Sequence, residues 1–470
     1  MDLTRRTFLL GTGAAAAQMI ADPSTVSASA GAPARAASPY ATLLELDKCV
    51  GCGSCVDACR ERNAARYPRV TGPMPELLPS GTRTEDWSKR QEVNDRLTPY
   101  NWLYIQTLEV EEGGAHRELH IPRRCMHCVN PPCVNLCPWG SCQLTVETGT
   151  VRIDPNACLG GAKCRSVCPW HIPQRQSGVG LYLHLMPRFA GNGVMYKCDR
   201  CADSFATGVL PACIEACPEG VQSIGPREEM LARARALARE RGHYLYGLED
   251  NGGTNTFYLS PVPIAALAAV KAAPGQPDFA PKANSMAQAG NLWRALLVAP
   301  LAGVAAGHAG QAREVAPSAV PGGPSPSRWI KPLWVALALA LGFTGMLQMP
   351  IAGRYGLNKL PLLGWTGDFY VSLNAHLALS ALLLVGCGWL AVRWWRGHTA
   401  TLTASGKLRL GLLAATLLTG MACATKLTPW LAVGPLWGMV WDLAHLGSSA
   451  LLGLAALYAL VRGRPWTRGD

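Results

Sequence analysis

The sequence contains no block of basic residues interleaved with aromatic side chains, although its formal net charge is +12. Much of the excess of Lys and Arg lies near the N-terminus and around long apolar segments. Nucleic acid is therefore not an expected partner. Cysteine is scarce in residues 291–470, which hold only Cys387 and Cys423, whereas 16 of the 18 cysteines lie between Cys49 and Cys217. This change in composition predicts a soluble, cysteine-rich part followed by a membrane part.

The cysteines of the first part form four motifs. The first, Cys49-Val-Gly-Cys52-Gly-Ser-Cys55-Val-Asp-Ala-Cys59, has the C-x2-C-x2-C-x3-C run of bacterial ferredoxins, and the others are variants with wider gaps or a loss. Three close cysteines hold three corners of one cubane, and the fourth ligates a neighbouring cluster. Four motifs therefore predict two ferredoxin-like pairs and four iron–sulfur clusters. The other motifs are Cys125, Cys128, Cys133 and Cys137; Cys158, Cys164 and Cys168; and Cys198, Cys201, Cys213 and Cys217.

Disulfides and zinc are the two alternative uses of these cysteines. Disulfides are the usual state of cysteine outside the cytoplasm, and zinc binds two C-x2-C pairs or mixtures of Cys and His. Neither requires a last cysteine that is followed by proline in three motifs, at Pro138, Pro169 and Pro218. The spacing therefore favours iron–sulfur clusters.

The third motif lacks one ligand, because Gly161 stands where the pattern requires a second cysteine. We expect a three-iron cluster there, at a higher potential than its neighbours. The alternative is a four-iron cluster completed by water or by Cys142, which lies outside the motifs. The simpler interpretation of Cys142 is a buried side chain without a ligand role. His127, inside the second motif, is expected to donate a hydrogen bond to cluster sulfur rather than to ligate iron.

The N-terminus predicts export. Thr4-Arg5-Arg6-Thr7-Phe8-Leu9 matches a twin-arginine signal, an apolar stretch follows up to Ile20, and Ala28-Ser29-Ala30 is the expected cleavage site. The twin-arginine route carries folded cargo, which suits clusters that are inserted in the cytoplasm. An ordinary Sec signal with two chance arginines is the alternative. Residues 1–30 are therefore excluded from the fold prediction.

The second part predicts a membrane domain. Four apolar segments near bilayer-spanning length lie at about 331–350, 370–392, 408–427 and 436–461, and a shorter one lies at about 292–308. With five spans and the cysteine-rich part outside, ten Lys or Arg residues lie on inner segments and three on outer loops, as the positive-inside rule requires. Four spans would reverse this bias. We therefore predict five spans and an inner C-terminus.

Two histidines, His376 and His445, lie within these segments. Both segments enter from the outer face in this topology, so the two imidazoles lie at similar depths. Two histidines on two helices suit ligation of a b-type haem near the outer face. The alternatives are two histidines hydrogen-bonded between helices, or one histidine that serves a quinone pocket.

The four motifs resemble those of the four-cluster iron–sulfur (beta) subunits of membrane-bound formate dehydrogenases and of a periplasm-facing nickel–iron (NiFe) hydrogenase. The resemblance runs from about Leu46 to Pro300 and includes Trp87-Ser88, Leu97-Thr98-Pro99-Tyr100 and Gly252-Gly253-Thr254. It implies that motif one pairs with motif four, and motif two with motif three. The implied ligand sets are Cys49, Cys52, Cys55 and Cys217; Cys59, Cys198, Cys201 and Cys213; Cys125, Cys128, Cys133 and Cys168; and Cys137, Cys158 and Cys164, with Gly161 as the departure.

Residues 331–462 resemble the small four-helix b-type cytochromes, on the basis of helix count, His376, His445 and the Gly-Phe-Thr-Gly segment from Gly342. Two-haem members of the formate dehydrogenase group use more histidines, so one haem b is expected. The predicted fold class is α+β, with tandem bacterial ferredoxin-like domains followed by an all-α transmembrane bundle. The expected domains are a signal (1–30), an iron–sulfur domain (31–285), an anchor helix (286–308), a linker (309–330) and the four-helix domain (331–462).

Members of the resembled family have no substrate site of their own, and this chain has no molybdopterin, nickel or flavin motif. The resemblance implies an electron-transfer subunit in the inner membrane with its iron–sulfur domain in the periplasm. Its partners would be a large molybdopterin or NiFe catalytic subunit and membrane quinone, the exchangeable substrate. Its expected cofactors are three 4Fe-4S clusters, one 3Fe-4S or incompletely ligated 4Fe-4S cluster, and one haem b. The alternatives are a stand-alone quinone oxidoreductase that uses a soluble carrier, and the input subunit of a quinol-driven reductase.

Overall fold

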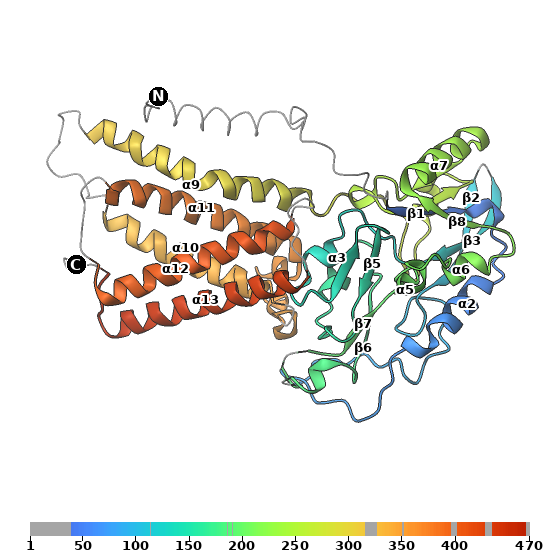
Figure 1. Cartoon of the computed structure of the whole chain (residues 1–470), viewed down its shortest axis with the longest axis horizontal. Coiled ribbons are helices and arrows are strands. Elements are labelled where there is room, and N and C mark those ends of the chain that lie inside the picture. The colour runs from blue at the N-terminus through green and yellow to red at the C-terminus, as the bar shows by residue number, and fades with distance from the viewer. Residues whose placement is uncertain are drawn as a thin grey trace.

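The computed structural model describes residues 39–112, 114–185, 187–189, 191–314, 327–349, 352–395, 402–427 and 435–466. It consists of an α+β part that holds the cysteine motifs and a bundle of long helices that extends from it (Figure 1). The predicted signal over residues 1–30 lies outside the described residues.

A four-stranded sheet, in the order β8-β1-β10-β9, supports the α+β part. Strand β1 (Tyr40–Glu45) pairs in parallel with β10 (Thr256–Ser260) and antiparallel with β8 (Gln222–Pro226), and β9 (Tyr244–Tyr246) pairs antiparallel with β10. The sheet therefore joins the two ends of the cysteine-rich segment. One face is covered by α7 (Arg227–Arg241), whose Met230 and Ala234 are buried in the same cluster as sheet residues.

Three hairpins and several short helices surround the cysteines. The helices α2, α3, α4, α5 and α6 begin within one residue of a cysteine, because the chain must turn sharply to bring several sulfur atoms to one point. The residues Gly51, Gly53, Arg200 and Cys201 have left-handed φ angles at these turns. The hairpins are β2–β3 (Tyr104–Glu112 and Ala115–Arg123), β4–β5 (Cys142–Thr145 and Thr150–Ile153) and β6–β7 (Gln174–Gln176 and Val194–Tyr196). The helices are α2 (Ser54–Asn63), α3 (Pro132–Asn135), α4 (Lys163–Ser166), α5 (Ala202–Phe205), α6 (Ala212–Glu215) and α8 (Ile264–Ala269).

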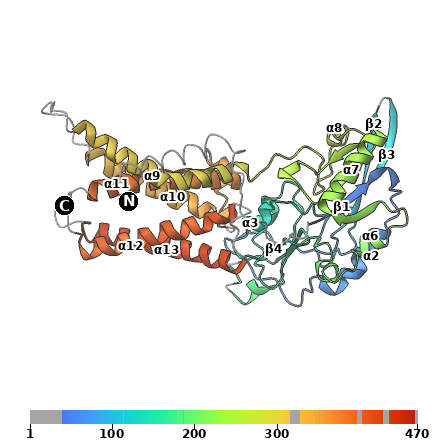
Figure 2. The same cartoon turned by 45° about the horizontal axis from the view of Figure 1, so that its top comes forward.

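Among the described residues, five helices make up the bundle, and successive helices run in opposite directions (Figures 1 and 2). Helices α9, α11 and α13 begin next to the α+β part, so the end of α13 lies at the opposite end of the bundle. Four of the described helices contain segments long and apolar enough to cross a membrane: Ala287–Ala309, Phe369–Val392, Ala404–Leu427 and Leu436–Val461. The apolar part of α10, Pro332–Leu347, is shorter. The helices are α9 (Ala287–Glu314), α10 (Ser327–Leu347), α11 (Phe369–Trp395), α12 (Ala404–Ala424) and α13 (Pro435–Val461).

The predicted linker over residues 309–330 is shorter than expected. Helix α9 continues to Glu314, and α10 begins at Ser327. The last residues of α9 are mostly of types with high helix propensity, so the sequence is compatible with a helix beyond its apolar part. The hydropathy pattern shows only where the apolar part of α9 ends. The helix itself continues beyond that point.

Helix α9 packs closely against α11 through small residues. A Cβ atom added at Gly303 would lie 2.0 Å from the carbonyl oxygen of Val385, and one added at Gly388 would lie 2.3 Å from that of Pro300. Gly303 and Gly307 form a G-x-x-x-G pair, which is typical of close contacts between membrane helices. The predicted anchor helix is thus an integral member of the bundle.

The bundle meets the α+β part at the loops that carry motifs two and three. Leu136 and Val167 are buried in one cluster with Trp293 of α9 and Leu373 of α11. The Tyr370 hydroxyl donates to the Val167 carbonyl oxygen at 2.7 Å. These contacts place the cysteines of the third motif beside the membrane helices.

Candidate metal centres

The first predicted cysteine set surrounds one cavity. Cys49, Cys52, Cys55 and Cys217 all line it, together with mainly apolar residues and the polar Glu219 and Gln222. The Cys217 sulfur accepts a hydrogen bond from the Val221 N–H group at 3.4 Å. Burial and the neighbouring Cys213 raise the pKa of Cys55 to about 12, so a thiolate there needs a cation close by. Iron would supply that charge, and the donor set fits an iron–sulfur cluster.

The second predicted set surrounds a second cavity, lined by Cys59, Cys198, Cys201 and Cys213. Arg124, a residue that sequence reasoning missed, lines it too and donates from Nη1 to the Cys213 sulfur at 2.8 Å. Cys55 and Cys59 are one helical turn apart on α2 and line different cavities, so this helix connects the two sites. This is the cross-over arrangement that the C-x3-C spacing predicts.

The third set is brought together in the loops near the bundle. Burial raises the pKa of the Cys128 thiol, and the neighbouring Cys168, Cys133 and Cys125 raise it further. Asn251, which is buried, donates from Nδ2 to the Cys128 sulfur at 3.4 Å. Such N–H donors stabilise thiolate sulfur, so these four residues also fit a cluster.

The incomplete fourth set lies next to the third. Burial raises the pKa of the Cys164 thiol, and the neighbouring Cys158 and Cys137 raise it further. The Cys158 sulfur accepts backbone hydrogen bonds from Gly160 at 3.5 Å and from Met195 at 3.4 Å. The three remaining cysteines of this set therefore converge without a fourth at position 161.

Cys142 is buried and lies against the third set. The neighbouring Cys133, a member of that set, raises the pKa of the Cys142 thiol most, and burial raises it further, whereas Cys164 of the fourth set contributes less. All 18 cysteines belong to the described part of the chain, and all of them are free thiols. The disulfide alternative therefore finds no support in the structure.

Buried cations that the motif analysis did not identify surround these sites. Arg124, Lys197 and Arg200 are each at most 5% exposed. Burial lowers the pKa of Lys197, but Cys125, Cys142 and Cys133 outweigh it and raise the pKa above its usual value. The signal in the sequence that could have revealed them is their closeness to cysteines: Arg124 directly precedes Cys125, and Lys197 and Arg200 lie on either side of Cys198. Their charges offset those of the thiolates.

His127 takes the neutral tautomer expected of a donor to sulfur. Its Nδ1 atom accepts a hydrogen bond from the Val151 N–H group at 3.0 Å, which leaves the proton on Nε2, 3.9 Å from the Cys198 sulfur. Burial and the nearby Arg200 lower the pKa of His127 well below its usual value, so the ring is uncharged.

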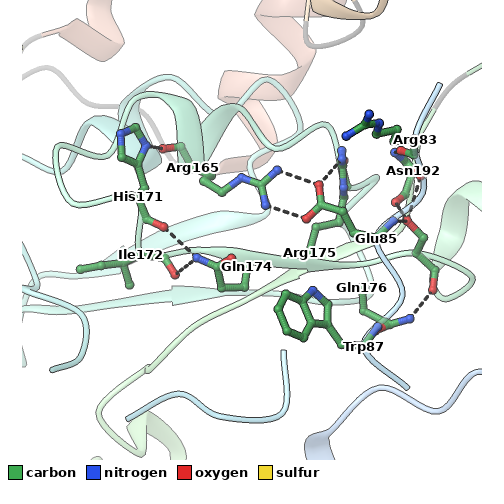
Figure 3. Close-up of polar contacts among 12 residues, drawn as sticks. Arg83, Glu85, Trp87, Arg165, His171, Ile172, Gln174, Arg175, Gln176 and Asn192 are labelled. Atoms are coloured by element: carbon green, nitrogen blue, oxygen red, sulfur yellow. Dashed lines mark hydrogen bonds and ion pairs between the residues drawn. The ribbon is translucent and has the colours of Figure 1, made fainter. Parts of the chain in front are cut away.

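The long segment between motifs one and two forms ion pairs with the loop of motif three (Figure 3). Glu85 binds Arg165 through both carboxylate oxygens, at 2.7 and 2.8 Å, and also binds Arg175. Arg165 lies between Cys164 and Cys168 on the chain. Burial would raise the pKa of Glu85, but the two arginines lower it below its usual value. The motifs predict no role for segment 60–124. Through Glu85, part of this segment holds the loop of the third cysteine motif in place.

His376 of α11 and His445 of α13 face each other inside the bundle. Their ring centres are 6.3 Å apart, and the ring planes are inclined by 76°. A metal bonded to one nitrogen of each ring at about 2 Å separates two imidazole centres by roughly 6 Å. The pair therefore fits two axial ligands of one haem iron.

Known proteins match the cysteine-rich part of the chain. Two models described as "4Fe-4S dicluster domain" match residues 48–141 and 117–227. The hydrogenase-2 operon protein HybA of Escherichia coli O157:H7 is 31% identical over 262 residues, which cover 48% of this chain and 71% of HybA. The formate dehydrogenase-O iron-sulfur subunit of E. coli K12 is 30% identical over 47% of this chain and 66% of its own length. A sulfite dehydrogenase subunit of Allochromatium vinosum is 28% identical over 43% of this chain and 75% of its own length.

The two dicluster models share the four cysteine motifs between them, and neither reaches the helical bundle. The motifs, the convergent cysteines and the similarity to HybA lead to one assignment: the chain belongs to the family of 4Fe-4S iron–sulfur subunits that includes HybA and the iron–sulfur subunits of formate dehydrogenases.

Proposed function

We propose that this chain is the electron-transfer subunit of a periplasm-facing respiratory oxidoreductase complex. It passes electrons between a separate catalytic subunit and the membrane quinone pool. The observation that carries this proposal is the position of the cysteine loops. Helices α2 and α6, with cysteines of the first two sets, lie far from the bundle, whereas α3 and the third motif lie against it (Figure 1). The four sets thus form a path that ends at the membrane helices.

Each set of cysteines is proposed to hold one cluster, with the ligands that the resemblance implies. The first three sets provide four sulfur ligands each and would hold 4Fe-4S clusters. The fourth provides Cys137, Cys158 and Cys164, and would hold a 3Fe-4S cluster. The Cys133 contact of Cys142 supports a spectator role for Cys142, because it directs this thiol toward the third set.

One haem b, held by His376 and His445, is proposed to continue the path inside the bundle. The histidines lie about two and three turns after the starts of α11 and α13, and both helices begin at the α+β part, so the haem would lie in the half of the bundle nearer to the clusters. When bound, the haem would supply one-electron chemistry between clusters and quinone. The distance of 6.3 Å between the two imidazole ring centres supports this proposal.

The proposed topology has five spans. Helix α10 is included because it lies alongside the other helices and returns the chain to the α+β part. The cysteine-rich part and the end of α13 then lie on opposite sides of the membrane, which agrees with the positive-inside rule. The iron–sulfur part would be periplasmic and the C-terminus cytoplasmic, as the twin-arginine signal requires.

The catalytic partner is proposed to be a large molybdopterin or NiFe subunit. Elemental analysis of the complex, purified gently from native membranes, tests this. Molybdenum or tungsten beside iron would indicate a pterin enzyme with formate as the leading substrate, and nickel would indicate a hydrogenase. Iron alone, without a larger subunit, would contradict the proposal and favour a stand-alone quinone oxidoreductase. In a quinol-driven reductase, the same cofactors would carry electrons in the opposite direction, from quinol to the catalytic subunit.

A further inference from the structure

The two halves of the four-helix region α10–α13 share a sequence pattern. Helices α10 and α12 both contain Thr-Gly-Met, beginning at Thr344 and Thr419. Helices α11 and α13 both contain Ala-His-Leu followed two residues later by Ser-Ala-Leu-Leu, around His376 and His445. Between residues 371–383 and 440–452, eight of 13 aligned positions are identical. The apolar composition of membrane helices explains paired leucines, but it does not explain Thr, Gly, His and Ser in the same order.

The shared residues make the same contacts in both hairpins. Thr344 Oγ1 lies 3.0 Å from His376 Nδ1, and Thr419 Oγ1 lies 3.3 Å from His445 Nδ1. Each threonine donates its hydroxyl proton to the carbonyl oxygen four residues earlier, of Ala340 at 2.8 Å in one hairpin. The corresponding bond in the other hairpin, to Ala415, is 2.7 Å long.

The serines that follow the histidines repeat this correspondence. Ser380 donates to the carbonyl oxygen of His376 at 2.8 Å, and Ser449 donates to that of His445 at 2.6 Å. Sequence pattern and contact pattern therefore agree position by position in the two hairpins.

These contacts fix the tautomer of both imidazoles. Because each threonine hydroxyl donates its only proton to a carbonyl group, its oxygen acts as an acceptor toward Nδ1. His445 Nδ1 also lies 3.1 Å from the carbonyl oxygen of Thr416, which can only accept. Each ring therefore carries its proton on Nδ1, and the lone pair of Nε2 is left for an electron-pair acceptor such as a metal.

In each hairpin, the glycine that follows the threonine leaves space for the histidine ring. A Cβ atom added at Gly345 would lie 3.3 Å from Cε1 of His376, and one added at Gly420 would lie 2.9 Å from Cε1 of His445. The ring of each histidine therefore lies directly against the backbone of the preceding helix. The threonine supplies a hydrogen bond and the glycine supplies space, on neighbouring residues of the same helix.

We infer that α10–α11 and α12–α13 are tandem copies of one helical hairpin, and that each copy uses its Thr-Gly pair to position one axial imidazole. Thr344 positions His376, and Thr419 positions His445. The inference rests on the haem of the proposed function. It assigns to each threonine an electronic effect, because an N–H···O bond strengthens the imidazole as a ligand. It also assigns an orientational effect, because the bond holds the two ring planes near the observed 76°.

The test compares Thr344→Val and Thr419→Val, which keep the shape of the side chain but remove the hydroxyl, with Thr344→Ser and Thr419→Ser. Thr416→Val is a matched control, because the Thr416 hydroxyl also bonds its own helix, to Leu412 at 2.9 Å, while only its backbone carbonyl contacts His445. Haem content, the EPR spectrum of the ferric haem and its midpoint potential are measured on the full membrane complex.

Nearly perpendicular ligand rings give a strongly anisotropic low-spin ferric signal, and this is expected for the wild type. Thr344→Val is expected to shift the signal toward a more rhombic form and to raise the midpoint potential, because the imidazole becomes a weaker donor. Thr419→Val is expected to cause smaller shifts of the same sign, because the carbonyl oxygen of Thr416 still accepts from His445 Nδ1. The serine variants are expected to restore both properties, and Thr416→Val is expected to match the wild type. If the valine variants hold haem and their spectrum and midpoint potential are unchanged, the positioning role of the threonines is contradicted, but the proposed haem is not.

The remaining outcomes concern the haem content of the wild type and of each variant. A wild-type complex without a b-type spectrum would contradict the proposed haem itself, before any variant is compared. Loss of haem in the valine variants, with retention in the serine and Thr416→Val variants, would support the positioning role. Equal loss in all of them, Thr416→Val included, would overturn it, since the hydroxyl next to the ring would then have no special effect.

Discussion

The Nζ atom of Lys163 lies 2.8 Å from the backbone carbonyl oxygen of Gln348. Lys163 directly precedes Cys164 of the incomplete fourth set, and Gln348 follows the last residue of α10. The same ammonium group lies 3.9 Å from the ring centre of Phe369 at the start of α11. One side chain therefore joins the loop of the fourth set to both helices of the first hairpin, and it brings a positive charge to the point where electrons would enter the bundle.

Replacing Lys163 is expected to lower the reduction potential of the fourth cluster. A positive charge near a cluster favours its reduced state, and Coulomb's law at an effective dielectric constant of about 20 gives an effect on the order of 50 mV for Lys163→Met. An EPR-monitored redox titration measures it at a pH of about 6, because burial lowers the pKa of Lys163 to about 7. Lys163→Arg, which keeps the charge, should stay close to the wild type. Equal potentials in the Met and Arg variants would contradict the expected charge effect.

Gly161→Cys is expected to convert the fourth cluster from the three-iron to the four-iron form. Gly161 does not have a left-handed φ, so a side chain is compatible with its backbone. The oxidised wild type should show the sharp EPR signal of a three-iron cluster, and the variant should lose it and gain iron. Cys142→Ala provides the control. If Cys142 is a spectator, this variant keeps the wild-type signal; a changed spectrum would make Cys142 a ligand.

Glu85→Gln is expected to loosen the loop of motif three. The variant leaves Arg165 and Arg175 without their shared carboxylate, at a cost of about 1–3 kcal/mol for a pair that is only partly buried. Thermal unfolding and the rate of iron release from the purified protein report the effect. Glu76→Gln removes a carboxylate that is 74% exposed and should change neither quantity. Equal behaviour of the two variants would show that the clamp does not stabilise the cluster loop.

The iron–sulfur ligands could be predicted from the sequence because the spacing within each cysteine motif is local, whereas the grouping of motif one with motif four, and of motif two with motif three, was implied by the family resemblance. Cys55 and Cys59 line different cavities simply because they lie one turn apart on a helix beside the C-x2-C run. Arg124 and Glu85 could not be predicted in the same way. Arg124 contacts a cysteine 89 residues away, and Glu85 contacts an arginine 80 residues away, so both contacts exist only after the chain has folded.

In the membrane half, too, contacts between residues far apart in the sequence could not be predicted. Hydropathy located the helices, but it did not predict the close contact of α9 with α11, which depends on where Gly303 and Gly388 face each other. His376 and His445 could be recognised as a pair from composition and depth. The threonines and glycines that hold their rings could be recognised only once their contacts were known, although the repeated Thr-Gly-Met was already present in the sequence.

Asp442→Asn is expected to destabilise the second hairpin. Asp442 forms an ion pair with Lys426 one helical turn before His445, and the two side chains are 26% and 13% exposed. An unpaired ammonium group near apolar helices costs about 1–3 kcal/mol after allowance for this exposure. Haem retention during heating in detergent reports the loss. The double variant Asp442→Asn/Lys426→Met removes both charges and should recover most of the stability; no recovery would mean that the pair itself is unimportant.

Gly303→Ala is expected to separate α9 from α11. The added Cβ atom would lie 2.0 Å from a backbone carbonyl oxygen, so one helix must shift, at a cost of about 1–3 kcal/mol for overpacking. Gly290→Ala is the matched control: Gly290 lies on the same helix, no atom lies within 4 Å of its added Cβ, and alanine favours the helix by up to about 1 kcal/mol. Thermal unfolding of the purified protein should therefore distinguish two identical chemical changes on one helix. If both variants unfold like the wild type, α9 is held to the bundle by its flanking segments and not by the glycine contact.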